Sequence, residues 1–178
     1  MVIFVAGVHG VGKTYLCQAL ASKTGLRHAS ASQLIREERQ VATWGDDKIV
    51  TEVRGNQDAL NAAVDRILQE QPILVLDGHF VLKKADGVLE EVPPVTFERL
   101  GLSAIVLVEN DPQLIAERLF QRDTNNAAGD IGEFIRSERR TAISTSINLG
   151  IPFFLLHSPS AEAFADCIES ILKHSARK

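Results

Sequence analysis

The stretch GVHGVGKT, at residues 7–14, constrains the fold of this chain more than any other. It matches the pattern G-x-x-x-x-G-K-[S/T], follows the apolar run Val2–Ala6, and leads into a helical pattern that begins at Lys13. Strand, glycine-rich turn and helix in this order present backbone N–H groups and a helix N-terminus to an anion. The stretch therefore predicts an α/β protein whose first strand ends in a phosphate-binding loop.

The residue types in this loop suit a nucleoside triphosphate bound with Mg²⁺. Glycine lets the backbone approach a phosphate closely, the Lys13 ammonium is expected to reach the β- and γ-phosphates, and the Thr14 hydroxyl is expected to bind the metal. His9 either contacts phosphate or points away from the loop. We expect ATP and Mg²⁺ as cofactors, with GTP open as an alternative donor. The expected nucleotide-binding residues are Gly7, Val8, His9, Gly10, Val11, Gly12, Lys13, Thr14 and Tyr15.

The chain alternates short apolar runs with amphipathic helical patterns, which is typical of a mainly parallel sheet. Runs such as ILVL and AIVLV are apolar on both faces, so helices are expected on both sides of the sheet. The predicted fold is that of a P-loop NTPase: a three-layer α/β sandwich with a five-stranded, mainly parallel sheet, in a single domain spanning residues 1–178. Strands are expected at residues 2–6, 73–76, 104–108 and 153–156, with a weaker one at 26–29, and helices at 13–24, 30–38, 56–69, 112–122, 131–149 and 159–173.

Local patterns refine this outline. The Ser30-x-x-Gln33 spacing predicts a capping box at the start of the second helix. Residues 80–92 are typical of two short strands around an Asp-Gly turn. Residues 123–130, DTNNAAGD, are small, polar and helix-breaking, and they predict a mobile loop between two helices. Such a loop is a candidate to close over a substrate and exclude water.

Composition excludes several classes of protein. The formal net charge of −4 provides no overall basic field for nucleic acid. No apolar run approaches the ~18 residues that span a bilayer. Cys17 and Cys167 show no metal-like spacing and are expected to be free core thiols. Because the strand pattern begins at Val2, no room is left for a signal peptide, and we expect a cytoplasmic protein that binds small-molecule nucleotides, with a protein partner left open.

Four further segments carry a family resemblance: HASASQLIREE at 28–38, ILVLDGH at 73–79, RLFQRD at 118–123 and an E-x-x-R-x-x-R-R pattern at 133–140. Together with the loop at 7–14, they make nearly the whole chain resemble the nucleoside monophosphate kinases, with a layout closest to that of the archaeal-type adenylate kinases. The resemblance implies phosphate transfer from ATP-Mg²⁺. It also implies an acceptor-binding segment at about 30–70 and a lid at about 118–140.

The same resemblance implies roles for individual residues. Arg36 falls where the family holds the α-phosphate of the acceptor, and Ser32 falls near the acceptor's base or ribose. Arg118 and Arg122 share a helix face and correspond to lid arginines that neutralise the transferred phosphoryl group. For each arginine the alternative is a solvated helix face. One of three arginines on the next helix is also expected to reach the phosphates: Arg136, Arg139 or Arg140.

Asp77 ends the strand pattern at 73–76, where ligands bind in open α/β sheets. Its carboxylate is a candidate to hold Mg²⁺ or to orient the acceptor, and a simple strand-end cap is the alternative. His79 follows as a histidine does in the archaeal enzymes, and it is either an acceptor contact or a loop residue. The common adenylate kinases carry a second phosphate-binding arginine shortly after this point, which this sequence lacks.

The sequence therefore predicts a P-loop kinase that moves the γ-phosphate of ATP to a small acceptor, with a nucleoside monophosphate expected. One alternative is a kinase for a nucleoside, a sugar acid or a polynucleotide 5′ end. Another is an ATP-binding or ATPase switch that acts through a protein partner. Such a switch would be expected to carry a water-activating carboxylate directly after Asp77, and Gly78 favours transfer instead. The site residues expected are Lys13, Arg118, Arg122 and Asp77 for catalysis, Ser32, Arg36 and His79 for the acceptor, and Thr14 and Asp77 for the metal.

Overall fold

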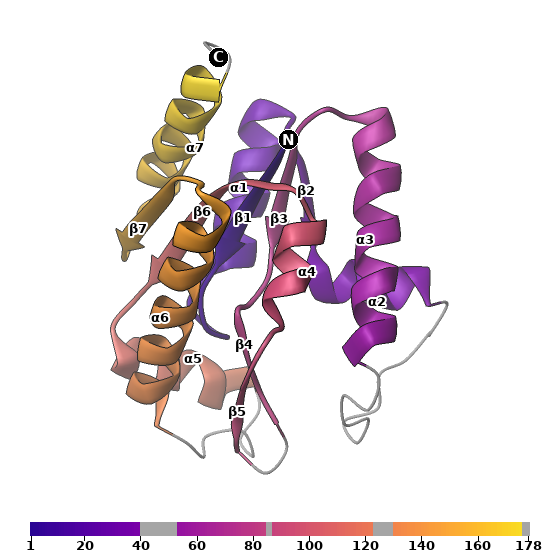
Figure 1. Ribbon diagram of the computed structural model, residues 1–178. Helices are drawn as coiled ribbons and strands as arrows, with labels where there is room; N and C mark the ends of the chain where they lie inside the picture. The colour runs from indigo at the N-terminus through magenta and orange to yellow at the C-terminus, as the bar shows by residue number, and fades with distance from the viewer. Residues whose placement is uncertain (40–52, 85–86, 123–129, 176–178) are drawn as a thin grey trace.

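The computed structural model describes residues 1–39, 53–84, 87–122 and 130–175. Its centre is a sheet with the strand order β2-β3-β1-β6-β7, in which every neighbouring pair is parallel (Figure 1). The next strands along the chain, β2 and β3, lie on one side of β1 in the sheet, and the later strands β6 and β7 lie on the other side. The loop after β1 therefore lies at the switch point where open α/β sheets bind ligands. The strands are β1 (Val2–Ala6), β2 (Arg27–Ser30), β3 (Leu74–Asp77), β6 (Leu102–Glu109) and β7 (Phe153–His157).

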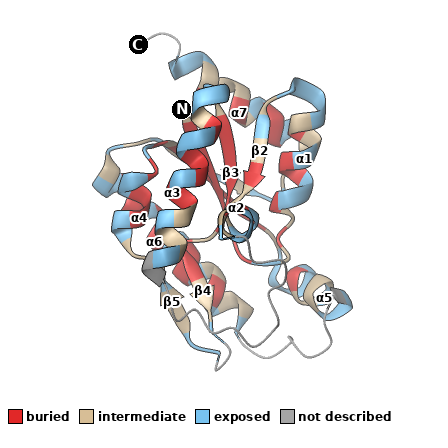
Figure 2. Ribbon diagram, turned by 90° about the vertical axis from the view of Figure 1, so that its right-hand side faces the viewer, coloured by how far each residue is buried: buried red, intermediate tan, exposed pale blue. Residues whose placement is uncertain are grey.

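Helices cover both faces of this sheet. α1 and α7 lie on one face, while α3, α4 and α6 lie on the other (Figures 1 and 2). This confirms the predicted three-layer P-loop fold. Within the described ranges, no helix is both long enough and apolar enough to cross a bilayer. The helices are α1 (Lys13–Thr24), α2 (Ala31–Glu38), α3 (Val53–Glu70), α4 (Pro94–Arg99), α5 (Pro112–Arg122), α6 (Ile131–Leu149) and α7 (Ala161–Ser175).

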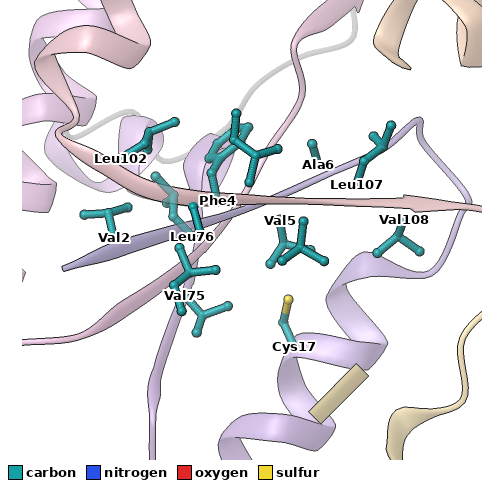
Figure 3. Packing of buried hydrophobic residues seen from close by; sticks show 14 of the residues in the cluster. Val2, Phe4, Val5, Ala6, Cys17, Val75, Leu76, Leu102, Leu107 and Val108 are labelled. Atoms are coloured by element: carbon teal, nitrogen blue, oxygen red, sulfur yellow. The ribbon is translucent and has the colours of Figure 1, made fainter. Parts of the chain in front are cut away.

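The strands supply the core, and an aromatic cluster extends it towards α4. All residues of β1 and β3 are buried, and Figure 3 shows their side chains packed together with Cys17 of α1 among them. Three phenylalanine rings pack together. The ring centroid of Phe4 lies 5.1 Å from that of Phe80 and 5.5 Å from that of Phe97, and the centroids of Phe80 and Phe97 are 4.5 Å apart. Burying each ring contributes about 1.5–3 kcal/mol. The cluster fixes β1, the segment after β3 and α4 relative to one another.

Most predicted elements are confirmed, with small shifts at their ends. Gly25 and Gly150 end α1 and α6 in the left-handed region, with φ of 73° and 63°, which favours glycine at these positions. The predicted hairpin is confirmed as β4 (Val81–Lys83) paired antiparallel with β5 (Leu89–Glu91). Residues 123–129 of the predicted mobile loop lie outside the described residues.

The predicted capping box is wrong. Ser30 is the N-cap residue of α2, but its side chain makes no capping bond and lies 3.1 Å from the Ser32 hydroxyl. Gln33 instead donates to Glu37 at 2.7 Å, because residues four apart share a helix face. The sequence prediction also omits α4, whose six residues begin at Pro94. So short a helix is difficult to detect from its hydrophobic periodicity.

Replacing Phe80 by alanine should lower the free energy of unfolding by about 3–5 kcal/mol, because its ring is fully buried against Phe4 and Phe97. Phe120→Ala is the matched control. This ring is 56% exposed on α5, so its loss should change the free energy by less than about 0.5 kcal/mol. Urea unfolding followed by circular dichroism measures both variants. Equal effects would contradict the packing described.

Candidate phosphate-binding and acceptor site

Residues 7–14 connect β1 to α1 and form the start of the site. Gly7 has a φ of 143°, and a Cβ there would lie 2.4 Å from the carbonyl oxygen of Val108 on β6, so only glycine fits. Gly12 is the N-cap of α1, with a φ of 110°. Among the described residues, no side chain caps this helix end. The first N–H groups of α1 are therefore oriented to receive an anion.

Lys13 is folded back onto its own loop. Its Nζ donates to the carbonyl oxygens of Gly7 at 2.5 Å and Val8 at 3.3 Å, and it lies 3.2 Å from Nε2 of His79. Burial lowers the pKa of Lys13 to about 8, although nearby carboxylates, Glu138 first among them, act in the opposite direction. The loop thus holds the ammonium with its own carbonyl oxygens, next to the N-terminus of α1.

The carboxylate of Glu138, on α6, joins the loop to the segment after β3. Its Oε1 accepts from the N–H of Gly7 at 3.1 Å and from that of Phe80 at 3.0 Å. Its Oε2 accepts from the N–H of Val81 at 2.8 Å. Glu138 is 1% exposed, and this burial raises its pKa, while the N–H donors and Lys13 lower it. Both oxygens accept hydrogen bonds, so the group fixes the phosphate-binding loop and the segment after β3 to one helix.

Sequence reasoning missed Glu138, although a signal was present. Phe134 and Ala142 are buried on α6, and Glu138 lies on the same face, four residues from each. A carboxylate on the buried face of an amphipathic helix requires hydrogen-bond partners. The pattern therefore marks Glu138 as a residue with a specific contact, although it does not reveal the partners.

Asp77 ends β3 directly beside Val5 of β1. Its Oδ2 lies 2.7 Å from Nε2 of His28, and the Cys17 sulfur belongs to the same group of atoms, all within 4.8 Å of one another. Cys17 is a free cysteine, as predicted, and burial raises the pKa of its thiol. Mg²⁺ prefers oxygen ligands. The exposed Thr14 hydroxyl and the Asp77 carboxylate offer oxygen atoms, and their binding of Mg²⁺ stays a prediction.

His79 and His9 stack with ring centroids 4.0 Å apart. Burial lowers the pKa of His79, and Lys13 and His9 act in the same direction. The neutral ring can therefore accept a hydrogen bond from the Lys13 ammonium at Nε2. His9 is exposed at the loop surface, as is Tyr15, so their contacts with a nucleotide stay predictions.

Arg118 of α5 contacts the phosphate-binding loop. Its Nη1 donates to the carbonyl oxygens of Gly10 at 3.3 Å and Val11 at 3.1 Å. The fold thus brings Arg118 to a loop that is distant in sequence, and its role as a lid arginine stays a prediction. Arg122 is the last residue of α5, and its side chain lies outside what the structure describes. Its role stays a prediction.

The three arginines of α6 each contact an acid. Arg136 pairs with acids at the start of its own helix. Arg139 makes two hydrogen bonds to Glu109, which ends β6 at the same edge of the sheet as the loop. Arg140 lies 3.8 Å from Glu91. Among these contacts, that of Arg139 is therefore the one made at the end of a strand of the five-stranded sheet, whereas Arg140 meets the end of β5 in the small hairpin.

A cavity of about 440 Å³ adjoins these residues, a volume within the usual range for small-molecule sites. Its wall includes the three predicted acceptor residues, Ser32, Arg36 and His79, and also Asp77. Arg36 donates from Nε to the carbonyl oxygen of Ser32 at 3.3 Å. The structure thus brings the predicted acceptor residues into one cavity. Its apolar lining includes Phe4, Ile35, Leu60, Leu82, Val92, Phe97 and Leu100.

The parallel sheet, the glycine-rich loop after β1 and the adjoining cavity define a P-loop protein with the fold of the small nucleotide and sugar kinases. The chain belongs to the AAA domain family, which it matches over residues 6–136. It is similar to the adenylate kinase of Saccharolobus islandicus, with 23% identity over 202 residues that cover 94% of this chain and 97% of the relative. The adenylate kinase of Saccharolobus solfataricus is 28% identical over 166 residues, covering 82% of this chain and 85% of the relative.

Solved structures agree on the fold. The shikimate kinase from Acinetobacter baumannii, in complex with shikimate, superposes with a TM-score of 0.62 at 17% identity, covering 99% of this chain and 95% of that one. A putative kinase from Chloroflexus aurantiacus gives a TM-score of 0.61 at 18% identity, covering 97% and 96%. The resemblance to archaeal adenylate kinases and the predicted fold class are both confirmed.

Replacing Lys13 by methionine should change how stability depends on pH. Burial lowers the pKa of Lys13 from 10.5 to about 8, so between these values the unfolded chain holds a proton that the folded protein has released. The stability of the wild type relative to Lys13→Met should therefore rise with pH across this window, by roughly 3 kcal/mol at most. Urea unfolding of both proteins at several pH values in the window measures the difference. A difference independent of pH would show that Lys13 is solvated in the free protein.

Proposed function

We propose that this chain is a phosphotransferase that moves the γ-phosphate of ATP, with Mg²⁺, to a nucleoside monophosphate. The observation that carries the proposal is the cavity, whose wall includes Asp77 and His79 beside the loop and the guanidinium of Arg36. A largely apolar lining suits a flat base, whereas a sugar acid needs a polar partner for each hydroxyl group. The adenylate kinase relatives make AMP the first acceptor to test.

On the donor side, the chain neutralises the charge that moves. Lys13 exchanges its loop carbonyl oxygens for the β- and γ-phosphate oxygens of ATP. Arg118 and Arg122 neutralise the transferred phosphoryl group as its bond to the β-phosphate breaks. Mg²⁺, held by Thr14 and Asp77, supplies further neutralisation of the phosphates when it is bound. Catalysis is then positioning combined with electrostatic stabilisation.

On the acceptor side, the chain positions the attacking phosphate. Arg36 binds the acceptor phosphate through its planar guanidinium, which can make two parallel hydrogen bonds to phosphate oxygens. Ser32 contacts the base or the ribose. The acceptor-binding segment is placed at about 30–70 and the lid at about 118–140, and parts of both lie outside the described residues.

Gly78 favours transfer over hydrolysis. A Cβ at this position would lie 2.7 Å from the ring of Phe4, so a side chain cannot be added after Asp77 without moving that ring. The place where a regulated NTPase would carry a water-activating carboxylate is thus closed by the core. This supports a bound acceptor, rather than water, as the source of the nucleophile.

Arg118→Ala should lower kcat by about 10³ or more while leaving the Kd of ATP within about threefold, because the arginine acts most strongly in the transition state. Arg66→Ala is the control. Its side chain, on α3, is 55% exposed and pairs with Glu38, so its loss should not change kcat. Steady-state rates and isothermal titration measure the two quantities. A kcat near that of the wild type would assign Arg118 to the structure of the loop alone.

ADP release from ATP-Mg²⁺ should be stimulated by a nucleoside monophosphate, with AMP, CMP, UMP, GMP and dTMP tested against shikimate and gluconate. Arg36→Ala should raise the KM of the active acceptor by about 10-fold or more and leave ATP binding nearly unchanged, because a charge-assisted contact is lost. Arg36→Lys should restore only part of the affinity, since lysine keeps the charge but not the planar fork. If no nucleotide stimulates ADP release, the proposed function is wrong.

A further inference from the structure

Two residues in the wall of the cavity each carry a buried polar atom that has no hydrogen-bond partner within the described part of the chain. The atoms are Oγ1 of Thr96, on α4, and Nε2 of Gln57, on α3, and both residues line the cavity. Both atoms are buried, and Thr96 as a whole is 4% exposed. A buried polar atom without a partner destabilises a folded protein. Its presence in a binding cavity is explained if a ligand completes the hydrogen bond.

The side chains around these two atoms restrict what the ligand can be. Phe97 and Leu100 follow Thr96 along the chain, Leu60 lies one turn after Gln57 on α3, and all three line the same cavity. The occupant must therefore present mostly apolar faces. It must also carry at least one hydrogen-bond acceptor, because an amide nitrogen can only donate. A nucleobase combines flat apolar faces with a polar edge, and a polyhydroxylated sugar acid does not.

We propose that Gln57 and Thr96 select the acceptor by hydrogen bonding to the polar edge of its base. This inference rests on the proposed function and names the residues that distinguish a nucleotide from other acceptors. Gln57 donates from Nε2 to a ring nitrogen or a carbonyl oxygen of the base. The Thr96 hydroxyl donates to, or accepts from, a second atom of the same edge. Arg36, in the same cavity, is left to bind the phosphate.

Thr96→Val tests the proposal, since valine has nearly the same shape without the hydroxyl. Removing an unpartnered buried hydroxyl should raise the melting temperature by about 2–4 °C. The acceptor KM should rise about 3- to 10-fold, with the Kd of ATP unchanged. A Thr96→Val variant that is more stable but binds the acceptor more weakly would show that the hydroxyl serves ligand binding. A threonine with only a structural role would leave the acceptor KM as it is.

Asn61 provides a matched control on α3. It is buried, and neither of its side-chain polar atoms has a partner among the described residues, yet it does not line the cavity. Asn61→Leu should therefore stabilise the protein while leaving the acceptor KM within about twofold of the wild type. The comparison separates the effect of an unpartnered polar group from the effect of its position in the cavity.

Gln57→Glu gives a second readout that does not depend on stability. It replaces a hydrogen-bond donor by an acceptor at nearly the same shape. The ratios of kcat/KM between AMP, GMP, CMP and UMP should therefore change by about tenfold or more. The inference is overturned if the wild type phosphorylates a nucleoside monophosphate and both variants keep its KM and its base preference. If the wild type phosphorylates none of these nucleotides, the proposed function fails first and the inference fails with it.

Discussion

The hydrogen bonds of the Glu138 carboxylate hold the phosphate-binding loop and the segment after β3 on α6. One oxygen accepts from the N–H of Gly7, and the other accepts from the N–H of Val81. A buried polar group is costly without its hydrogen bonds, so neither segment can move away without leaving buried polar atoms unpaired. The position of Lys13 relative to the acceptor cavity therefore depends on a helix distant in sequence from both.

The aromatic cluster of Phe4, Phe80 and Phe97 both stabilises the core and shapes the cavity. Phe4 and Phe97 pack against Phe80 in the core, and both also line the cavity. The shape of the cavity is thus set by side chains that stabilise the fold. The same packing restricts position 78 to glycine, because the ring of Phe4 leaves no space for a side chain there. A substitution that enlarged the cavity through these rings would reduce the stability of the protein as well.

The parts of this structure that could be predicted from the sequence are those whose signal is local. The loop around Lys13 follows from one contiguous motif, and the buried strands follow from continuous apolar runs. The partners of Glu138 could not be predicted, because it meets Gly7 across 131 residues of sequence. The proposed role of Thr96 could not be predicted for the same reason, since its place in the cavity wall depends on how α3 and α4 pack in the fold. The capping box at Ser30 failed because a spacing cannot decide between competing hydrogen bonds.

Under the proposed function, the contact between Lys13 and His79 would make the two halves of the site thermodynamically dependent on each other. A phosphate that binds the Lys13 ammonium competes with the imidazole of His79, and that imidazole is part of the acceptor cavity. A donor bound as proposed would thereby alter the cavity wall that the acceptor contacts. By reciprocity, an acceptor that engages His79 changes the affinity for the donor by the same factor. One hydrogen bond of the free protein would thus give cooperativity between the two proposed ligands.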